Sequence, residues 1–336
     1  MVLSPRLGFL GLGWIGRNRM QALLDSGLGT VVAVADPDAE AARQSADATG
    51  ALARSRLEEL LELGLDGIVI ASPSALHAGQ AILALESGVP VFVQKPLARS
   101  AAEAEAVLAV AQQLGRPFGV DLSYRHTRAA QRMRSELRSG RIGQAFAAQL
   151  VFHNAYGPDK EWFLDRRRSG GGCMIDLGTH LIDLLLWLLG GELHAEAAAL
   201  LRKGAPLGGG ENEVEDYAAV QLRTEAGAPV QLACSWFLPA GRDCAFECTL
   251  YGTVGSLAMT NIGGSFYDFQ LELRQGTQAE ILVSPPDEWG GRALCEWARR
   301  LAAGDGFDTR LAKQLQAVSA VIDAVYDARL ATVDEG

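Results

Sequence analysis

The first third of the chain alternates short apolar runs with longer segments in which apolar residues recur every three or four positions. Short runs of this kind predict strands, the longer segments predict helices, and their alternation is typical of a parallel sheet covered by helices. We expect strands at residues 7–10, 31–35, 68–71, 89–93 and 118–120. We expect helices at residues 15–25, 39–48, 56–63, 75–87 and 101–114. Residues 1–121 are therefore predicted to form one doubly wound α/β domain.

The pattern changes after residue 121. A helical segment at 128–139, a strand at 144–152 and a strongly apolar helix at 175–189 come first. Strand-like runs separated by Gly and Pro then dominate, as in an antiparallel sheet, at residues 217–222, 230–236, 245–251 and 269–273. A last helical stretch at 310–330 is expected to pack back on the body. We therefore predict a second, α+β domain over residues 122–336.

Composition narrows the class of protein. The chain has 336 residues, of which 49% are hydrophobic, and is long enough for two packed domains. Its 30 basic and 40 acidic side chains give a net charge of -10, which repels nucleic acid and anionic lipid, so we expect neither as a partner. The five cysteines have no CxxC spacing, which argues against a disulfide framework or a zinc site. We see neither a signal peptide nor an apolar run of membrane-spanning length, and expect a cytoplasmic protein with no membrane partner.

A glycine-rich motif follows the first expected strand and opens the first expected helix. Gly11, Gly13 and Gly16 form GxGxxG, with Trp14 and Ile15 between the last two glycines. In this position glycine permits a tight turn, a close approach of phosphate to the backbone, and close packing of helix on strand. Amide groups at the start of the helix can then hold a pyrophosphate. The motif predicts a dinucleotide site.

An acidic residue ends the second expected strand. Asp36 lies 20 residues after Gly16, where a carboxylate can accept hydrogen bonds from the adenosine ribose hydroxyls. Asp38 and Glu40 follow and would repel a 2'-phosphate, which favours NAD. NADP is the less favoured cofactor, because Arg43 could still reach such a phosphate. Capping of the next helix by Asp36 is compatible with this role.

Two further loops should lie at the carboxyl edge of the parallel sheet, where such folds bind ligands. Ser72, Pro73 and His77 follow one strand, and Gln94 and Lys95 follow the next. We predict that these residues line the cofactor site and that the lysine also reaches the substrate hydroxyl. Ser72 could instead cap a helix, His77 could be a buried helix residue, and Lys95 could be an exposed surface lysine.

The apolar helix expected at 175–189 carries polar groups at helical spacing. Asp176 and His180 are four residues apart and share a face with Asp183. A carboxylate beside an imidazole suits acid–base catalysis, because histidine titrates near neutral pH. A satisfied buried polar pair is the alternative. We predict no metal, because the sequence places no third ligand there.

Together these motifs resemble the Gfo/Idh/MocA family, named for glucose-fructose oxidoreductase, inositol 2-dehydrogenase and a rhizopine catabolism protein. The resemblance rests on GLGWIG at 11–16, VADPD at 34–38, ASPSALH at 71–77, QKPL at 94–97 and GGGCMIDLGTHLID at 170–183. It implies a Rossmann domain followed by a domain with an open mixed sheet, which often forms dimers or tetramers through its outer face. It also implies hydride transfer between NAD and a carbinol carbon of a sugar, a sugar derivative or a cyclitol.

The resemblance assigns the family's catalytic lysine to Lys95, its helix aspartate to Asp176 and its histidine to His180. His180 would take the hydroxyl proton as hydride leaves carbon, Asp176 would orient His180 or bind a neighbouring hydroxyl, and Lys95 would polarise the reacting oxygen. The chain departs from the family at Gln94, where members commonly have Glu. An amide can hydrogen-bond there but brings no charge to the lysine or the cofactor.

Four more side chains are expected to contact the substrate. Tyr124 and Arg125 follow the last strand of the first domain, and Trp162 and Arg166 precede the glycine run. The basic run 166–168 could signal an acidic sugar, although an exposed basic loop is the favoured explanation.

Three other functions stay open. The enzyme could use bound NAD as an internal redox aid for glycoside cleavage or epimerisation, or it could reduce a non-sugar substrate. The chain could also be a non-catalytic NAD-binding regulator, because fold alone does not fix substrate or activity.

Overall fold

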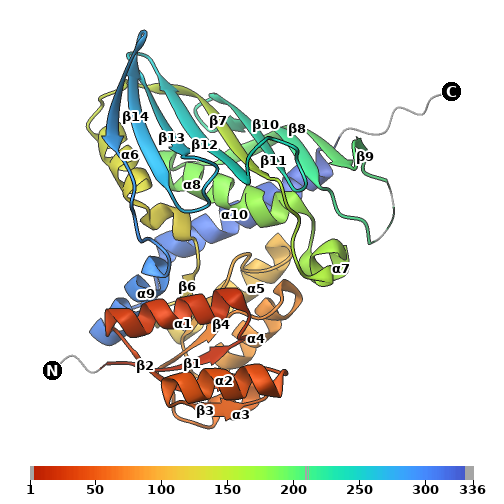
Figure 1. The fold of residues 1–336 in the computed structure, drawn as a ribbon, viewed down its shortest axis with the longest axis vertical. Coiled ribbons are helices and arrows are strands. Elements are labelled where there is room, and N and C mark those ends of the chain that lie inside the picture. The colour runs from red at the N-terminus through yellow and green to blue at the C-terminus, as the bar shows by residue number, and fades with distance from the viewer. Residues whose placement is uncertain (1–3, 209, 211, 330–336) are drawn as a thin grey trace. The chain divides into compact units, whose positions relative to one another are not determined.

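The computed structural model describes residues 4–208, 210 and 212–329, which form two compact units (Figure 1). The first unit contains the chain up to Ser123 and also Gly290–Gln316. The second contains Tyr124–Trp289 and the chain from Ala317 onward. We expected one boundary near residue 121, with all later residues in the second domain. The structure instead groups residues 290–316 with the first unit.

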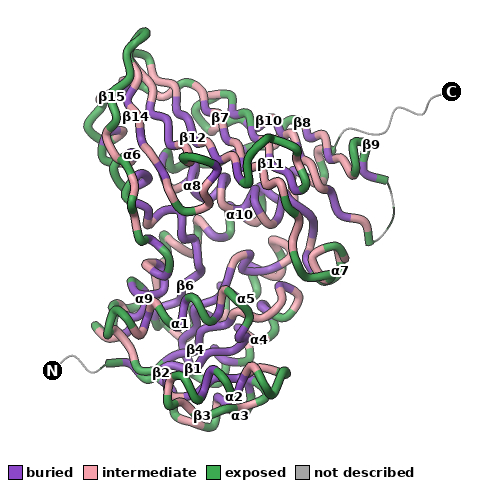
Figure 2. The backbone as a smooth tube through the Cα atoms, viewed as in Figure 1, coloured by how far each residue is buried: buried purple, intermediate pink, exposed green. Residues whose placement is uncertain are grey.

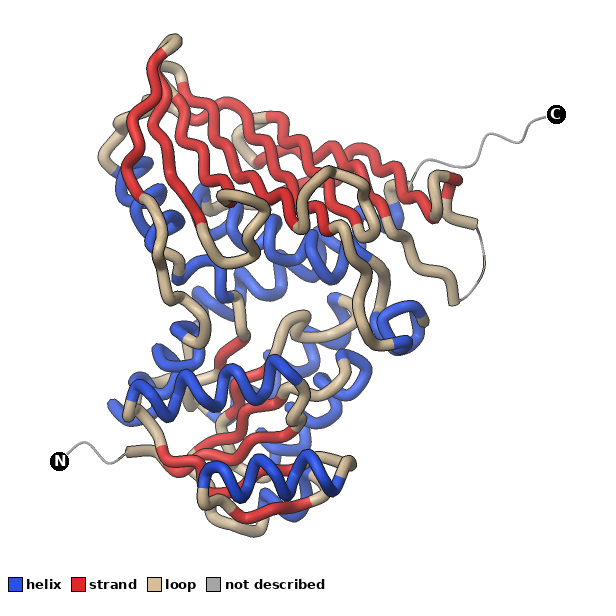
Figure 3. Tube along the Cα trace, in the orientation of Figure 1, coloured by secondary structure: helices blue, strands red, loops and turns tan. Residues whose placement is uncertain are grey.

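A six-stranded parallel sheet forms the centre of the first unit (Figure 3). Its strands are β1 (Arg6–Leu10), β2 (Thr30–Ala35), β3 (Leu52–Arg54), β4 (Gly67–Ile70), β5 (Val91–Val93) and β6 (Gly119–Val120). The helices between them are α1 (Trp14–Ser26), α2 (Ala39–Thr49), α3 (Leu57–Leu61), α4 (Ser74–Glu86) and α5 (Ala101–Leu114). The strand order β3-β2-β1-β4-β5-β6 confirms the predicted doubly wound sheet. Its order reverses between β1 and β4, where such sheets bind ligands.

Strand β3 is the one strand of this sheet that we did not predict. Its three residues are exposed or half-buried at the edge of the sheet, so they form no apolar run. Strand β4, by contrast, is buried at every position, as Figure 2 shows for the centre of the unit. Helices on both faces of a parallel sheet produce such continuous burial, which is why the central strands were readable from the sequence.

Helix α9 (Arg292–Ala303) anchors the returning segment to the first unit. The indole of Trp297 is buried and donates a hydrogen bond from Nε1 to the Pro117 carbonyl oxygen, over 3.1 Å. Gly67 and Gly119 leave room for this ring, because a Cβ at either position would lie less than 3 Å from it. This packing explains why a segment distant in sequence belongs to the Rossmann unit.

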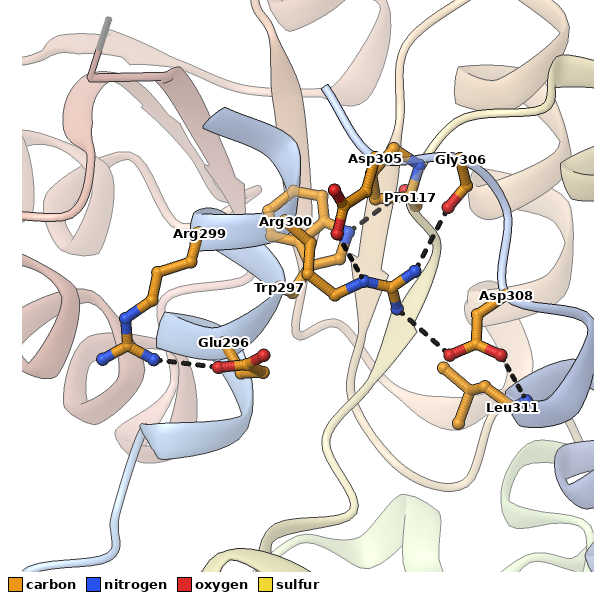
Figure 4. A network of polar contacts seen from close by, with 9 residues as sticks. All are labelled: Pro117, Glu296, Trp297, Arg299, Arg300, Asp305, Gly306, Asp308 and Leu311. Atoms are coloured by element: carbon orange, nitrogen blue, oxygen red, sulfur yellow. Dashed lines mark hydrogen bonds and ion pairs between the residues drawn. The ribbon is translucent and has the colours of Figure 1, made fainter. Parts of the chain in front are cut away.

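A polar network closes the turn after α9 (Figure 4). The guanidinium of Arg300 donates to the Gly306 carbonyl oxygen over 3.1 Å and to the carboxylates of Asp305 and Asp308, both over 3.4 Å. Asp308 in turn caps the start of α10 (Thr309–Asp327). The sequence predicted α10, except that its expected end at residue 330 lies outside the described residues.

A nine-stranded sheet dominates the second unit (Figure 3). Its strands are β7 (Ala145–Asn154), β8 (Leu193–Arg202), β9 (Ala205–Pro206), β10 (Tyr217–Thr224), β11 (Pro229–Ser235), β12 (Cys244–Gly252), β13 (Ser256–Asn261), β14 (Phe269–Gln275) and β15 (Gln278–Val283). They lie in the order β15-β14-β13-β12-β7-β11-β10-β8-β9. The pair β7 and β11 is parallel and the other neighbours are antiparallel. This confirms the open, largely antiparallel mixed sheet.

Helices cover one face of this sheet and share a core with it. They are α6 (Arg128–Arg138), α8 (Thr179–Leu189) and the later part of α10, whose apolar side chains join those of the strands in one buried cluster. Helix α8 directly follows a π-helical turn at Met174–Gly178, and the short helix α7 (Arg166–Ser169) precedes both. Strand β8 was not predicted, because its alanine-rich sequence has no strand signal. Pairing with β10 over most of its length overrides that local preference.

One segment meets the length and composition of a membrane span, contrary to our reading of the sequence. It is Arg166–Leu189, and 78% of its most apolar window is buried inside the structure. Burial of this kind is typical of a core helix, and α8 lies within the buried cluster of the second unit.

Candidate active site

The glycine motif forms an open cradle at the start of α1. Gly11 has a φ of 92°, and a Cβ there would lie 2.5 Å from the Ala71 carbonyl group. A Cβ at Gly16 would lie 2.1 Å from the Gly11 carbonyl oxygen. Gly13 differs, because nothing lies within 4 Å of its Cβ position and no side chain caps the helix it begins. The tight positions shape the turn and the open one leaves the helix amides accessible, so the loop fits a pyrophosphate.

Asp36 stands at the end of β2 and braces this loop. Its Oδ2 accepts a hydrogen bond from the Leu12 amide over 2.7 Å, and its Oδ1 accepts one from the Asp38 amide over 2.9 Å. Each carboxylate oxygen keeps a second acceptor position for a ribose hydroxyl. Asp38, not Asp36, caps α2. Arg43 is engaged by Glu40 and by the Asp47 carboxylate on the surface of α2.

The loop after β4 is tied to the loop after β5 by a buried histidine. His77 Nδ1 lies 2.8 Å from the Pro96 carbonyl oxygen, and its Nε2 lies 2.7 Å from the Ser72 carbonyl oxygen. Burial lowers the pKa of His77, although both carbonyl contacts act in the opposite direction. The Ser72 hydroxyl donates to Gln80 within α4, over 2.6 Å. His77 therefore holds together the two loops that carry Pro73 and Lys95.

Gln94 belongs to a buried polar network. Its Nε2 donates to Asp121 Oδ2 over 2.5 Å, and the same oxygen accepts from Arg19 Nε over 2.6 Å. Ser123 donates to the other oxygen of Asp121 and accepts from Arg19. Burial alone would raise the pKa of Asp121, but Arg19 and the three hydrogen bonds outweigh it and lower that pKa. The network joins α1 to the ends of β5 and β6, beside half-buried Lys95.

The second unit presents Asp176 and His180 from the π-helical turn and the start of α8. Both side chains are half-buried, whereas every other residue from Gly171 to Thr179 is buried. Asp176 Oδ2 accepts a hydrogen bond from Trp236 Nε1 over 3.1 Å. The His180 ring lies 4.7 Å from the Tyr124 ring, between centroids. A π-helical turn inside a helix is frequent at functional sites.

Comparisons with known proteins match both units. Residues 6–122 match the model of an oxidoreductase family with an NAD-binding Rossmann fold, and residues 130–258 match the GFO/IDH/MocA C-terminal domain. The chain belongs to the Gfo/Idh/MocA family. As a member of this family it is an oxidoreductase whose Rossmann unit binds a nicotinamide dinucleotide.

Individual relatives agree with this assignment. D-apiose dehydrogenase of Paraburkholderia graminis is 30% identical over 285 residues, which cover 83% of this chain and 73% of the relative. 1,5-anhydro-D-fructose reductase of Ensifer adhaerens is 30% identical over 76% of each chain. The solved structure of KijD10, a 3-ketoreductase from Actinomadura kijaniata, shares the fold with a TM-score of 0.85 at 21% identity, over 97% of this chain and 98% of that one.

The four residues expected to contact the substrate differ in burial: two are buried and two are half-buried. Tyr124 is buried among aromatic rings and stacks on Phe246, and Arg125 is buried in a bidentate ion pair with Asp183. Both therefore support the helix that carries His180. Trp162 and Arg166 are half-buried on the segment before the glycine run. The Trp162 ring stacks on Phe163, and the Arg166 guanidinium lies 5.2 Å from the centre of the Tyr326 ring.

Three residues that the sequence did not single out contact predicted site residues or their partners: Asp121 accepts from Gln94, Arg19 donates to Asp121, and Trp236 donates to Asp176. Arg19 and Asp121 are 102 residues apart, and Trp236 is 60 residues from Asp176. No motif joins them, because each pair meets through packing of elements that are distant along the chain. The only available signal was weak, namely a charged residue within an amphipathic or apolar segment, as at Arg19 and Asp121.

Proposed function

We propose that this chain transfers hydride between NAD and a carbinol carbon of a sugar, a sugar derivative or a cyclitol. The observation that carries the proposal is the exposure pattern of the second unit, where a buried helix leaves an aspartate and a histidine accessible. These are Asp176 and His180, and the first unit contributes a half-buried Lys95 after β5. The two curated relatives described above act on sugars by name, which supports the substrate class.

The proposed roles follow from the side chains. His180 accepts the proton of the substrate hydroxyl during oxidation and returns it during reduction. Asp176, fixed by the Trp236 indole, orients His180 or accepts a hydrogen bond from a neighbouring hydroxyl. Lys95 donates a hydrogen bond to the reacting oxygen and stabilises negative charge on it. The nicotinamide ring, when bound, supplies or accepts the hydride.

NAD is favoured over NADP by the surface around the end of β2. Asp36 keeps acceptor positions for both ribose hydroxyls, and its carboxylate would repel a 2'-phosphate. Arg43, the cation that could compensate, donates to Glu40 Oε1 over 2.7 Å and to Asp47 Oδ2 over 3.1 Å. Binding NADP through Arg43 would break those contacts.

We also propose a cytoplasmic homodimer or homotetramer. All five cysteines are free and buried, and the Sγ atoms of Cys173 and Cys234 lie 4.0 Å apart without a bond, which supports a reducing compartment. In β7 the positions that alternate with the buried ones are half-buried, and they include the apolar Ala147 and Val151. An apolar side chain on the uncovered sheet face is suited to a contact with a second copy.

Turnover assays test the proposed reaction. We would follow the absorbance of reduced nicotinamide while offering NAD or NADP with inositols, aldoses, sugar acids and amino sugars. Wild type is expected to turn over one of these classes with NAD, and Lys95→Ala and His180→Ala to lose at least about 100-fold in kcat. Lys160→Ala and His194→Ala are matched controls, because both side chains are exposed.

Two results would contradict the proposal. Full activity in His180→Ala would remove the assigned proton acceptor. Tight NAD binding without release of reduced cofactor on any polyol would favour internal redox catalysis or a regulatory role instead.

A further inference from the structure

A fully buried carboxylate lies behind the helix that carries Asp176 and His180. Glu215, just before β10, has no exposed surface. Its Oε1 accepts hydrogen bonds from the Met174 amide over 2.8 Å, the Gly172 amide over 3.0 Å and the Tyr326 hydroxyl over 2.9 Å. Its Oε2 lies 3.1 Å from the same Gly172 nitrogen.

These contacts hold the backbone at the start of the π-helical turn that precedes α8, one residue after another. The Cys173 amide, between the two already described, donates to the Glu215 carbonyl oxygen over 3.0 Å. The backbone amides of three successive residues, 172–174, therefore all donate hydrogen bonds to Glu215. Amides at the start of a helix have no partner within the helix, and the Cys173 side chain makes no capping hydrogen bond. Glu215 supplies from a distant segment what a local cap would otherwise supply.

The glycine run is shaped to fit this arrangement. A Cβ at Gly172 would lie 1.9 Å from the Glu215 carbonyl oxygen, and a Cβ at Gly171 would lie 1.9 Å from the Tyr326 hydroxyl oxygen. The guanidinium of Arg166 covers the Tyr326 ring. The backbone at Gly171 and Gly172 therefore packs in close contact with Tyr326 and Glu215, which come from two later parts of the chain.

A charged group in this position is costly for folding. Burial raises the pKa of Glu215, and its amide and phenol donors offset this only in part. An apolar side chain would avoid that cost but would leave the Gly172 and Met174 amides without their acceptor. The carboxylate is therefore retained together with the backbone geometry that it holds.

We propose that Glu215 is a positioning residue, which sets the placement of Asp176 and His180 by holding the Gly172 and Met174 amides. The inference rests on the proposed catalytic function of those two side chains. It predicts that replacing Glu215 slows the proton transfer carried out by His180 and leaves the affinity for NAD unchanged.

The placement of His180 can be read without turnover. The carbon-bound ring protons of the chain's five histidines are observable by NMR, with His180 assigned through His180→Gln. Its ring lies 4.7 Å from Tyr124, so a displacement changes its ring-current shift. Glu215→Leu is expected to move the His180 resonance. The resonance of His194, on β8 and exposed, should stay in place as an internal reference.

Turnover then connects placement to function. Glu215→Leu is expected to lower kcat by about 100-fold, the typical cost of a displacement near 1 Å, with unchanged NAD affinity. Glu215→Gln keeps an oxygen at Oε1 and should lie between wild type and Glu215→Leu. Leu222→Ala, a buried position on β10, controls for loss of stability and should leave both kcat and the His180 resonance unchanged.

The outcomes separate this inference from the proposed function. If wild type turns over no polyol, the proposed function fails, and the NMR comparison still decides whether Glu215 places His180. If Glu215→Leu does not fold, Tyr326→Phe removes one bond to Oε1 and should shift the resonance in the same direction by less. An unmoved His180 resonance in both Tyr326→Phe and Glu215→Gln, with wild-type kcat, would overturn the inference.

Discussion

Two buried carboxylates, Asp121 in the first unit and Glu215 in the second, are stabilised in opposite ways. In the first unit, Asp121 contacts a guanidinium, a hydroxyl and a primary amide, and its pKa is lowered despite burial. In the second unit, the hydrogen-bond donors to Glu215 are two backbone amides and a phenol, and burial raises its pKa. The first arrangement joins three elements through charge. The second fixes the backbone of one helix entrance, so removing a partner should have different consequences in each unit.

The largest expected effect is the loss of the cation in the first unit. Arg19→Met leaves Asp121 buried without its counter-charge, which should lower the free energy of unfolding by about 3–5 kcal/mol. Urea unfolding measures the loss, and faster hydrogen exchange of residues 91–93 would assign it to the first unit. Arg43→Met removes ion pairs that are exposed and should change stability little. In the double variant Arg19→Met/Asp121→Leu, part of the loss should be recovered, and an undiminished loss would contradict this explanation.

A smaller effect is expected from restoring the glutamate that the family commonly has before the lysine. Gln94→Glu would place a second carboxylate about 2.5 Å from Asp121 Oδ2, where Gln94 now donates a hydrogen bond. Two carboxylates at this distance do not both ionise readily, so the pKa of one of them should rise. We expect a loss of about 1–3 kcal/mol at neutral pH.

The pH dependence of this variant tests the cause. A carboxyl group whose pKa is raised by folding favours the folded state when protonated, so the destabilisation should be small in acid and grow as the pH rises. Unfolding of Gln94→Glu and Gln94→Met at pH values from about 5 to about 8 measures this. Gln94→Met loses the same hydrogen bond without adding charge, and equal pH slopes in the two variants would refute charge repulsion.

Glu215 should produce a pH slope of the same sign in the wild-type second unit. Its pKa is raised by folding, so its ionisation weakens stability as the pH rises above its ordinary value of 4.5 and through its raised folded value. Glu215→Gln should remove this slope, and the variant should gain relative stability with rising pH. Unfolding curves for Glu215→Gln beside Glu225→Gln, an exposed control, check the sign. A difference that is constant with pH would show that Glu215 does not ionise in this range.

Site residues that are close together in the sequence were predictable, whereas partners that are far apart in the sequence were not. The dinucleotide loop was predictable because Gly11, Gly13 and Gly16 are close together, between a readable strand and a readable helix. Asp176 and His180 were predictable as a pair because one helix carries both. The contact between Glu215 and Tyr326 spans 111 residues, and the contact between Arg19 and Asp121 spans 102. Long-range partners of this kind leave no periodic pattern.

Strand β8 shows the same limit for the fold. Its residues Leu193–Arg202 favour a helix by composition, and pairing with β10 along most of their length makes them a strand. Helix α9 was also missed, and with it the return of the chain to the first unit. Its position depends on space left for Trp297 by Gly67 and Gly119, a complementarity that single-sequence patterns do not contain.

The smallest effect on stability is expected at Gly13 of the glycine motif. This open position can be compared with the crowded Gly16. Gly13 has a φ of -62° and free space around its Cβ position, so Gly13→Ala should change stability by no more than about 0.5 kcal/mol. The added methyl group would occupy the space in front of the α1 amides and weaken NAD binding by about tenfold or more. Gly16→Ala should instead destabilise the unit, because its Cβ would lie 2.1 Å from the Gly11 carbonyl oxygen. Calorimetric NAD titration and thermal unfolding without NAD measure the two effects separately. Wild-type NAD affinity in Gly13→Ala would mean that the cofactor does not approach the backbone at this glycine.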